Sequence, residues 1–97
     1  MPTFVSLINW TEQGVKNFKD TTHRADDFTN AVEKAGGRVR EILWCVGEYD
    51  LVSVVEFPDD ESATASLLQT GALGNIRTNT MRGFNAQEMN RIIDKTG

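Results

Sequence analysis

The pattern of apolar and polar residues predicts four β-strands, two of which are apolar on both faces. Residues 3–10 (TFVSLINW) and 51–57 (LVSVVEF) are apolar at both odd and even positions. Because successive side chains of a strand point to opposite faces of its sheet, such strands belong in the middle of a sheet. Residues 38–46 and 75–84 carry charged and amide side chains among their apolar residues, as edge strands often do.

Residues 21–35 are predicted to form a helix, with Thr21 or Thr22 as its N-cap. Apolar residues recur there at intervals of three and four, which places them on one stripe of a helix. The stripe consists of Ala25, Phe28, Val32 and Ala35. Gly36-Gly37 is expected to end the helix, because glycine accepts the left-handed conformation found at helix C-termini. The polar segment 11–20 is expected to be a loop with a short helical turn.

Two further helices are predicted, each following a capping residue. The first begins after Asp59, continues to about Thr70 and is expected to end at Gly71. Its buried side is expected to comprise Ala63, Leu67 and Leu68. The second begins at the capping-box sequence Asn85-Ala86-Gln87-Glu88 and continues to about Lys95.

The resulting order, β-α-β-β-α-β-α, favours a ferredoxin-like fold of the α+β class. Residues 47–50 are too few for a helical crossover, so the second and third strands are expected to form an antiparallel hairpin. Each β-α unit returns to the sheet by a right-handed crossover, and two such units around the hairpin give the strand order 4-1-3-2. We expect residues 1–97 to form a single domain of this fold with an additional C-terminal helix.

Two helices can cover only one face of such a sheet. Both faces of the central strands are apolar: Val5 and Leu7 lie opposite Phe4, Ile8 and Trp10, and Val52 and Val54 lie opposite Leu51, Val55 and Phe57. The face that the helices leave open is therefore an apolar patch, and monomers rarely expose a large one. Packing the open faces of two copies against each other removes the patch from water, most commonly around a two-fold axis. The sequence therefore predicts a homodimer or a higher homo-oligomer.

Charge and composition argue against several classes of partner. Ten scattered lysines and arginines against fourteen acidic residues give a formal net charge of −4. Nucleic acid requires a clustered basic surface, so it is not expected as a partner. No apolar run approaches the roughly 20 residues of a membrane-spanning helix, and no membrane partner is expected. A strand that begins at Thr3 and the single cysteine, Cys45, predict a cytoplasmic protein, with Cys45 buried as a small hydrophobe.

Several segments resemble the GYD-domain family, which is named for a Gly/Tyr/Asp motif. The sequence Gly47-Glu48-Tyr49-Asp50, followed later by Pro58-Asp59, resembles the region of that motif. The segments 5–14 (VSLINWTEQG), 35–39 (AGGRV) and 73–78 (LGNIRT) also resemble the family. The resemblance implies membership of the dimeric α/β-barrel superfamily, in agreement with the fold and dimer expected above. It implies no particular activity, because the family has no established general function.

Few residues offer catalytic chemistry. His23 is the only histidine, and the dipole at the start of its predicted helix favours a neutral ring that can act as a base. Because related dimeric barrels sometimes use a histidine, His23 is the candidate catalytic residue, with a purely surface role as the alternative. The sequence contains no metal-ligand cluster, phosphate-binding loop or catalytic triad, so we expect neither a metal nor a cofactor.

Five other residues are candidates for ligand binding: Trp10, Trp44, Tyr49, Asp50 and Arg77. The tryptophans are predicted either to line a cleft or to pack in the core or an interface. Tyr49 and Asp50 offer a hydroxyl group and a charge to a ligand, or serve the turn itself. Arg77 offers an anion partner on the polar fourth strand, or belongs to an ordinary strand edge.

Three functional hypotheses follow. The leading one is a small oligomeric protein that binds a small ligand in a cleft between sheet and helices, or acts as an accessory protein. The second is a cofactor-independent enzyme acting on a small aromatic or carbonyl compound, with His23 as base and an arginine as anion holder. The third is a structural assembly unit whose sheet edges join subunits.

Overall fold

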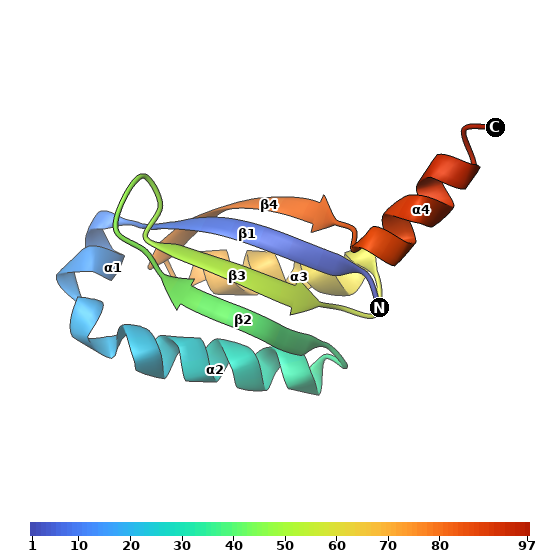
Figure 1. Cartoon of the computed structure of the whole chain (residues 1–97). Coiled ribbons are helices and arrows are strands. Elements are labelled where there is room, and N and C mark those ends of the chain that lie inside the picture. The colour runs from blue at the N-terminus through green and yellow to red at the C-terminus, as the bar shows by residue number, and fades with distance from the viewer.

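The computed structural model describes residues 1–97 and confirms the predicted order and topology (Figure 1). The strands are β1 (Thr3–Trp10), β2 (Arg38–Trp44), β3 (Leu51–Glu56) and β4 (Ile76–Gly83), and the helices are α1 (Glu12–Lys16), α2 (Thr21–Lys34), α3 (Asp60–Ala72) and α4 (Ala86–Asp94). A short 3₁₀ turn, Phe18–Asp20, joins α1 to α2. The strands form one antiparallel sheet in the order β2-β3-β1-β4, so the two strands that are apolar on both faces are central.

Helices α2 and α3 cover one face of the sheet and leave the other face open (Figure 1). Alternation along the central strands places Val5 and Leu7 of β1, with Val52 and Val54 of β3, on the open face. Helix α4 projects away beyond the end of β4 and makes only slight contact with the rest of the chain (Figure 1). No helix combines the length and apolar character that crossing a lipid bilayer requires.

The apolar core fills the space between sheet and helices at the end where β1 begins. Its buried members are Val32, Val55, Phe57 and Ala63, with Phe4, Phe28 and Val39 packed against them. The rings of Phe4 and Phe57 meet edge to face, with 6.0 Å between their centroids. This core does not extend to the opposite end of the sheet, around Trp10 and Leu51.

Two predictions for α2 are wrong. Neither threonine caps the helix, because the 3₁₀ turn leads directly into α2 and Thr21 already has helical dihedral angles (φ −60°, ψ −38°). Asp20 therefore occupies the N-cap position, without a side-chain hydrogen bond. The predicted apolar stripe is one residue too long, because Ala35 lies at the C-cap, after the last residue of the helix, and is exposed.

Two predictions for α3 are also wrong. The helix does not end at Gly71, which lies within its last turn; Gly74, at φ +84°, takes the left-handed position instead. Leu68 is 70% exposed, because the inward-facing side of α3 carries the small residues Ala63 and Ser66.

Cys45 is exposed, contrary to the prediction that it is buried. Strand β2 ends at Trp44, so Cys45 and the fully exposed Val46 belong to the connection to β3 and not to a buried strand. The backbone N–H of Cys45 donates to the carbonyl of Asp50 at 2.7 Å, which closes this connection.

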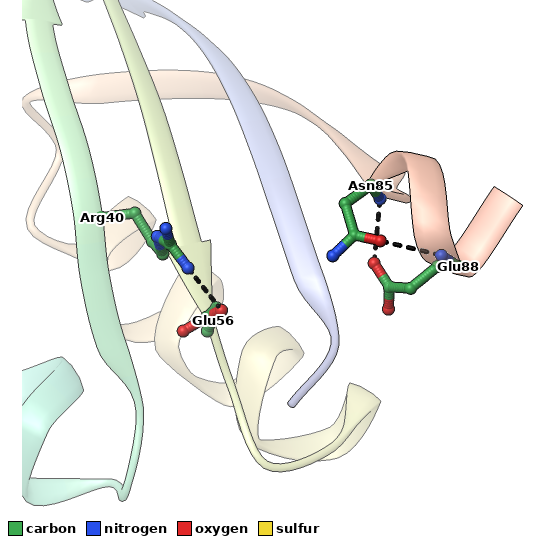
Figure 2. A network of polar contacts seen from close by, with 4 residues as sticks. All are labelled: Arg40, Glu56, Asn85 and Glu88. Atoms are coloured by element: carbon green, nitrogen blue, oxygen red, sulfur yellow. Dashed lines mark hydrogen bonds and ion pairs between the residues drawn. The ribbon is translucent and has the colours of Figure 1, made fainter.

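The predicted caps of α3 and α4 are confirmed. The carboxylate of Asp59 accepts a hydrogen bond from the backbone N–H three residues later, at 2.7 Å. Asn85 and Glu88 form the reciprocal capping box at the start of α4, with distances of 2.8 and 2.9 Å (Figure 2). On the hairpin, Arg40 pairs with Glu56 across the two strands at 3.1 Å (Figure 2).

Candidate functional site

A cavity of about 670 Å³ lies between the covered face of the sheet and helices α2 and α3. The sheet contributes Ile8, Trp10 and Leu51 to its lining, and the helices contribute Phe28 and Leu67. Ligand sites in proteins typically enclose roughly 300–1,000 Å³ behind mostly apolar walls, so the cavity has the size and character of such a site. It lies where the leading hypothesis expects a cleft.

A row of three small hydroxyl residues crosses the sheet at the cavity. Ser6 of β1 pairs with Ser53 of β3 on one side and with Thr80 of β4 on the other; we call these three residues the hydroxyl row. The oxygen atoms Ser6 Oγ and Thr80 Oγ1 share a hydrogen bond of 2.7 Å. Because Ser6 and Ser53 are much smaller than the apolar residues two positions before and after them, which share the covered face, the row leaves room between the sheet and the helices.

Two buried hydroxyl groups in the cavity lining have no hydrogen-bond partner in the chain. They belong to Ser53 on the sheet and Ser66 on α3, which are 3% and 8% exposed. Every side-chain oxygen that is completely shielded from solvent has a hydrogen-bond partner. Because the Ser53 and Ser66 hydroxyls have none, they are accessible from the cavity. Of the other lining hydroxyls, Thr21 accepts from Trp44 Nε1 at 3.0 Å, and Thr70 donates to a backbone carbonyl at 2.8 Å. Thr78 is exposed to solvent.

The only charged residues in the lining are Arg24 and Asp27 of α2. The guanidinium of Arg24 donates to the carbonyl oxygens of Asn17 at 2.8 Å and Gly14 at 3.2 Å, which ties α2 to the segment before it. The carboxylate of Asp27 is largely exposed and faces the Nε2 atom of His23 at 3.6 Å. No group of three or more histidine, cysteine, aspartate or glutamate side chains is placed to hold a metal ion.

Hydrogen bonds join residues 11–13 to residues 74–75 at the Trp10 end of the sheet. The hydroxyl of Thr11 donates to the carbonyl of Gly74 at 2.6 Å, and Gln13 Nε2 donates to the side-chain oxygen of Asn75 at 2.9 Å. Gly14 is buried against the same segment, and a Cβ atom there would overlap the carbonyl oxygen of Asn75. Segments far apart in the sequence are therefore locked together beside the cavity.

Trp10, Trp44 and Asp50 come together at this end of the sheet. Trp10 lines the cavity directly. Trp44 is 42% exposed and is linked to the cavity wall by its hydrogen bond to Thr21. The carboxylate of Asp50 accepts a hydrogen bond from the backbone N–H of Trp10 at 2.9 Å, which fixes the end of β1. Tyr49 is half-buried in the adjacent turn and does not line the cavity.

The structure does not place His23 or Arg77 in the cavity. The side chain of His23 is 78% exposed on the surface of α2. Arg77 alternates with Ile76, which lines the cavity, so Arg77 lies on the open face of the sheet.

The hydroxyl row and Ser66 were not identified from the sequence, although a signal for the row was present. Ser6 and Ser53 each interrupt an otherwise apolar central strand, and the antiparallel pairing of β1 with β3 places the two interruptions side by side. Recognising them required the register of the sheet in addition to its strand order. For Ser66, the only signal in the sequence is its spacing of three residues from Ala63, which places both residues on one side of α3.

Comparison with known proteins agrees with this architecture. A family model described as the GYD domain matches residues 4–93. A Thermus thermophilus protein named "Glutamine synthetase and cystathionine beta-lyase binding protein" is 28% identical over 85 residues, which cover 87% of this chain and 90% of that relative. The crystal structure of TTHA0845 from Thermus thermophilus matches with a TM-score of 0.55 and 26% identity, over 89% of this chain and 96% of that one. The family match extends from the first strand into the last helix, and the chain belongs to the GYD domain family.

Proposed function

We propose that this protein is a small homo-oligomeric accessory protein that binds a small organic molecule between its sheet and helices. The observation that carries the proposal is the cavity of about 670 Å³, with Ser53 and Ser66 presenting unpaired hydroxyl groups to it. An empty cavity lowers stability, because its lining atoms lack packing partners. Apolar walls with a few placed polar groups are the usual composition of a ligand site.

The cavity hypothesis is tested by filling the cavity from the helix side. The probe is 2-naphthol, titrated into ¹⁵N-labelled protein and followed by amide chemical shifts. We expect saturable shifts at residues lining the cavity in the wild type and their loss in Ser66→Phe, whose ring occupies the space. Thr64→Ala, on the exposed side of the same helix, is the matched control and should bind like the wild type. If Ser66→Phe does not fold, Ser66→Leu replaces it.

Two results contradict the cavity hypothesis. One is the absence of saturable shifts in the wild type. The other is a titration that is unchanged in the folded, cavity-filled variant.

The proposed homo-oligomer is a two-fold dimer formed through the open face of the sheet. Four strands spaced about 4.8 Å apart and some 20 Å long give a flat area on the order of 400 Å². Side-chain relief raises the accessible area above that value, toward the roughly 800 Å² per partner that stable interfaces bury. The centre of this face is apolar, with Arg77 and Asn79 on its β4 edge, and a second copy presents the same apolar centre, which supports a symmetric dimer.

The name of the Thermus relative supports an accessory role. That protein is named as binding glutamine synthetase and cystathionine β-lyase. For this chain we propose binding to a glutamine synthetase through the apolar stripe of α4, on which Met89 and Ile93 are 46% and 51% exposed. Purified glutamine synthetase from the same host should bind the wild type and Arg91→Glu, but not Ile93→Glu. Equal binding by all three, or by none, contradicts this contact.

No catalytic function is proposed for His23. Its ring is exposed on the surface of α2 beside Asp27 and is not among the residues that line the cavity.

A further inference from the structure

We infer that the cavity selects a neutral molecule with an apolar, ring-containing body and a hydroxyl or carbonyl oxygen. This inference rests on the proposed use of the cavity as a ligand site. It adds the chemical class of the ligand, which follows from the placement of Ser53 and Ser66 and from the balance of the nearby charges.

The two buried, unpaired hydroxyls define the polar part of the ligand. Ser53 and Ser66 lie on opposite walls, one on β3 and the other on α3, and each offers one O–H donor and two acceptor sites. A ligand hydroxyl that reaches them donates to one serine and accepts from the other, while a carbonyl oxygen accepts from one or both. Ser6 is less available, because it already shares a hydrogen bond with Thr80.

The balance of charges in the lining argues against an anionic ligand. The single cation in the lining, Arg24, already donates to two backbone carbonyls. Asp27 adds a negative charge to the same wall. Arg24 keeps further N–H donors, but Asp27 offsets its charge, so a carboxylate or phosphate that entered would lose its hydration in a lining of no net charge, which is unfavourable. A cationic ligand would meet only Asp27, which is largely exposed to water.

The apolar residues define the body of the ligand. Ile8, Leu51 and Ile42 form the sheet side of the lining, Phe28 lies on α2, and the indole of Trp10 lies at the end of β1. Aromatic side chains pack well against flat rings. The cavity volume exceeds that of two fused six-membered rings, so a ring system of this size fits without displacing either helix.

The test compares three probes that differ at one position: 2-naphthol, 2-methylnaphthalene and 2-naphthoate. Their dissociation constants are measured by titration with the wild type, Ser53→Ala, Ser66→Ala and the control Thr64→Ala. Ser53→Ala and Ser66→Ala should each raise the dissociation constant of 2-naphthol by about fivefold, which corresponds to the loss of one hydrogen bond of about 1 kcal/mol. Binding of 2-methylnaphthalene should not weaken, and 2-naphthoate should bind the wild type at least about tenfold more weakly than 2-naphthol.

The outcomes distinguish the inference from the proposed function beneath it. If no probe binds the wild type, the proposed function fails together with the inference. If 2-naphthol and 2-methylnaphthalene bind and lose affinity equally in the serine variants, only the inference is overturned. Preference for 2-naphthoate would also overturn it, because the charge of Arg24 would then outweigh that of Asp27 in selecting the ligand.

Discussion

Gly14 and Gly71 are both glycines within helices, but their surroundings are opposite. Gly14 of α1 packs so closely on the segment before β4 that an added Cβ would overlap the carbonyl oxygen of Asn75. That oxygen also accepts the hydrogen bond from the backbone N–H of Thr11, at 3.0 Å, so it cannot move away freely. An added Cβ at Gly71 of α3 would meet no atom within 4 Å.

The same substitution should therefore change stability in opposite directions at these two sites. Gly14→Ala should lower the free energy of unfolding by about 3 kcal/mol, because the overlap involves backbone on both sides. Gly71→Ala should raise it by about 0.5–1 kcal/mol, because alanine restricts the unfolded chain at a position that is already helical. Urea unfolding of both variants measures the difference. An equal change in the two would show that α1 is not packed against the segment before β4.

Some individual residues could be assigned from the sequence and others could not. Asp59, Asn85 and Glu88 are predictable as caps because capping depends on residues a few positions apart. The hydroxyl row depends on which residues of three strands lie side by side, and the pattern of apolar residues does not specify that register. Cys45 was misassigned because an apolar run does not reveal where its strand ends.

At the scale of elements, the start of α3 carries a pH-dependent contribution to stability. The backbone N–H of Ser62 donates to the carboxylate of Asp59 and, with further hydrogen bonds, holds the pKa of Asp59 below its ordinary value of 3.8. A lowered pKa in the folded state means that the fold favours the charged carboxylate. The stabilisation is therefore complete at pH values well above 3.8 and is lost as the pH falls through the folded-state pKa.

Asp59→Asn isolates this contribution, since asparagine caps a helix about as well but does not titrate. The stability difference between wild type and variant should be constant near neutral pH. Below the ordinary aspartate pKa, the wild type should lose stability relative to the variant, because only the wild type has a carboxylate there to protonate. Urea unfolding at a series of pH values measures it, and a difference that stays constant into acid would contradict the role given to the carboxylate.

Helix α4 should behave as an element separate from the core of the monomer. Its nine residues make only slight contact with the rest of the chain, and short isolated helices are marginal in water. Asn85→Ala should cost about 1 kcal/mol of helix stability and reduce the helical NMR shifts of residues 86–94. The unfolding temperature of the sheet domain should not change, and a marked decrease would mean that α4 belongs to the cooperative core.

The types and order of the elements were predictable because they follow from hydrophobic periodicity and connection length. The end of α3 was less predictable: Gly71 and Gly74 are both plausible stop signals, and tertiary contacts with α1 decide between them. Gln13 donates to the carbonyl of Leu73, and Thr11 donates to that of Gly74. The cavity was expected only in its general location, because its volume depends on the side chains that face each other across two layers.

At the scale of the whole molecule, the open face of the sheet should hold two copies together. We expect light scattering to give a mass twice the 10.8 kDa of the chain. Replacing the exposed open-face residues Leu43 and Met81 by glutamate should give the monomer mass, because each charge would be buried in the interface. Leu68→Glu, on the exposed side of α3, is the matched control and should remain dimeric. A wild-type monomer at all concentrations contradicts the dimer.

The function proposed for the molecule depends on the space between sheet and helices being a ligand site organised by Ser53 and Ser66. A crystal structure of the protein soaked with 2-naphthol is the decisive experiment. We expect density for the ring system against Trp10 and Phe28, with the naphthol oxygen within hydrogen-bond distance of at least one of the two serines. Density confined to another surface, or a cavity closed by inward movement of α2 and α3 at saturating probe, would refute the ligand site.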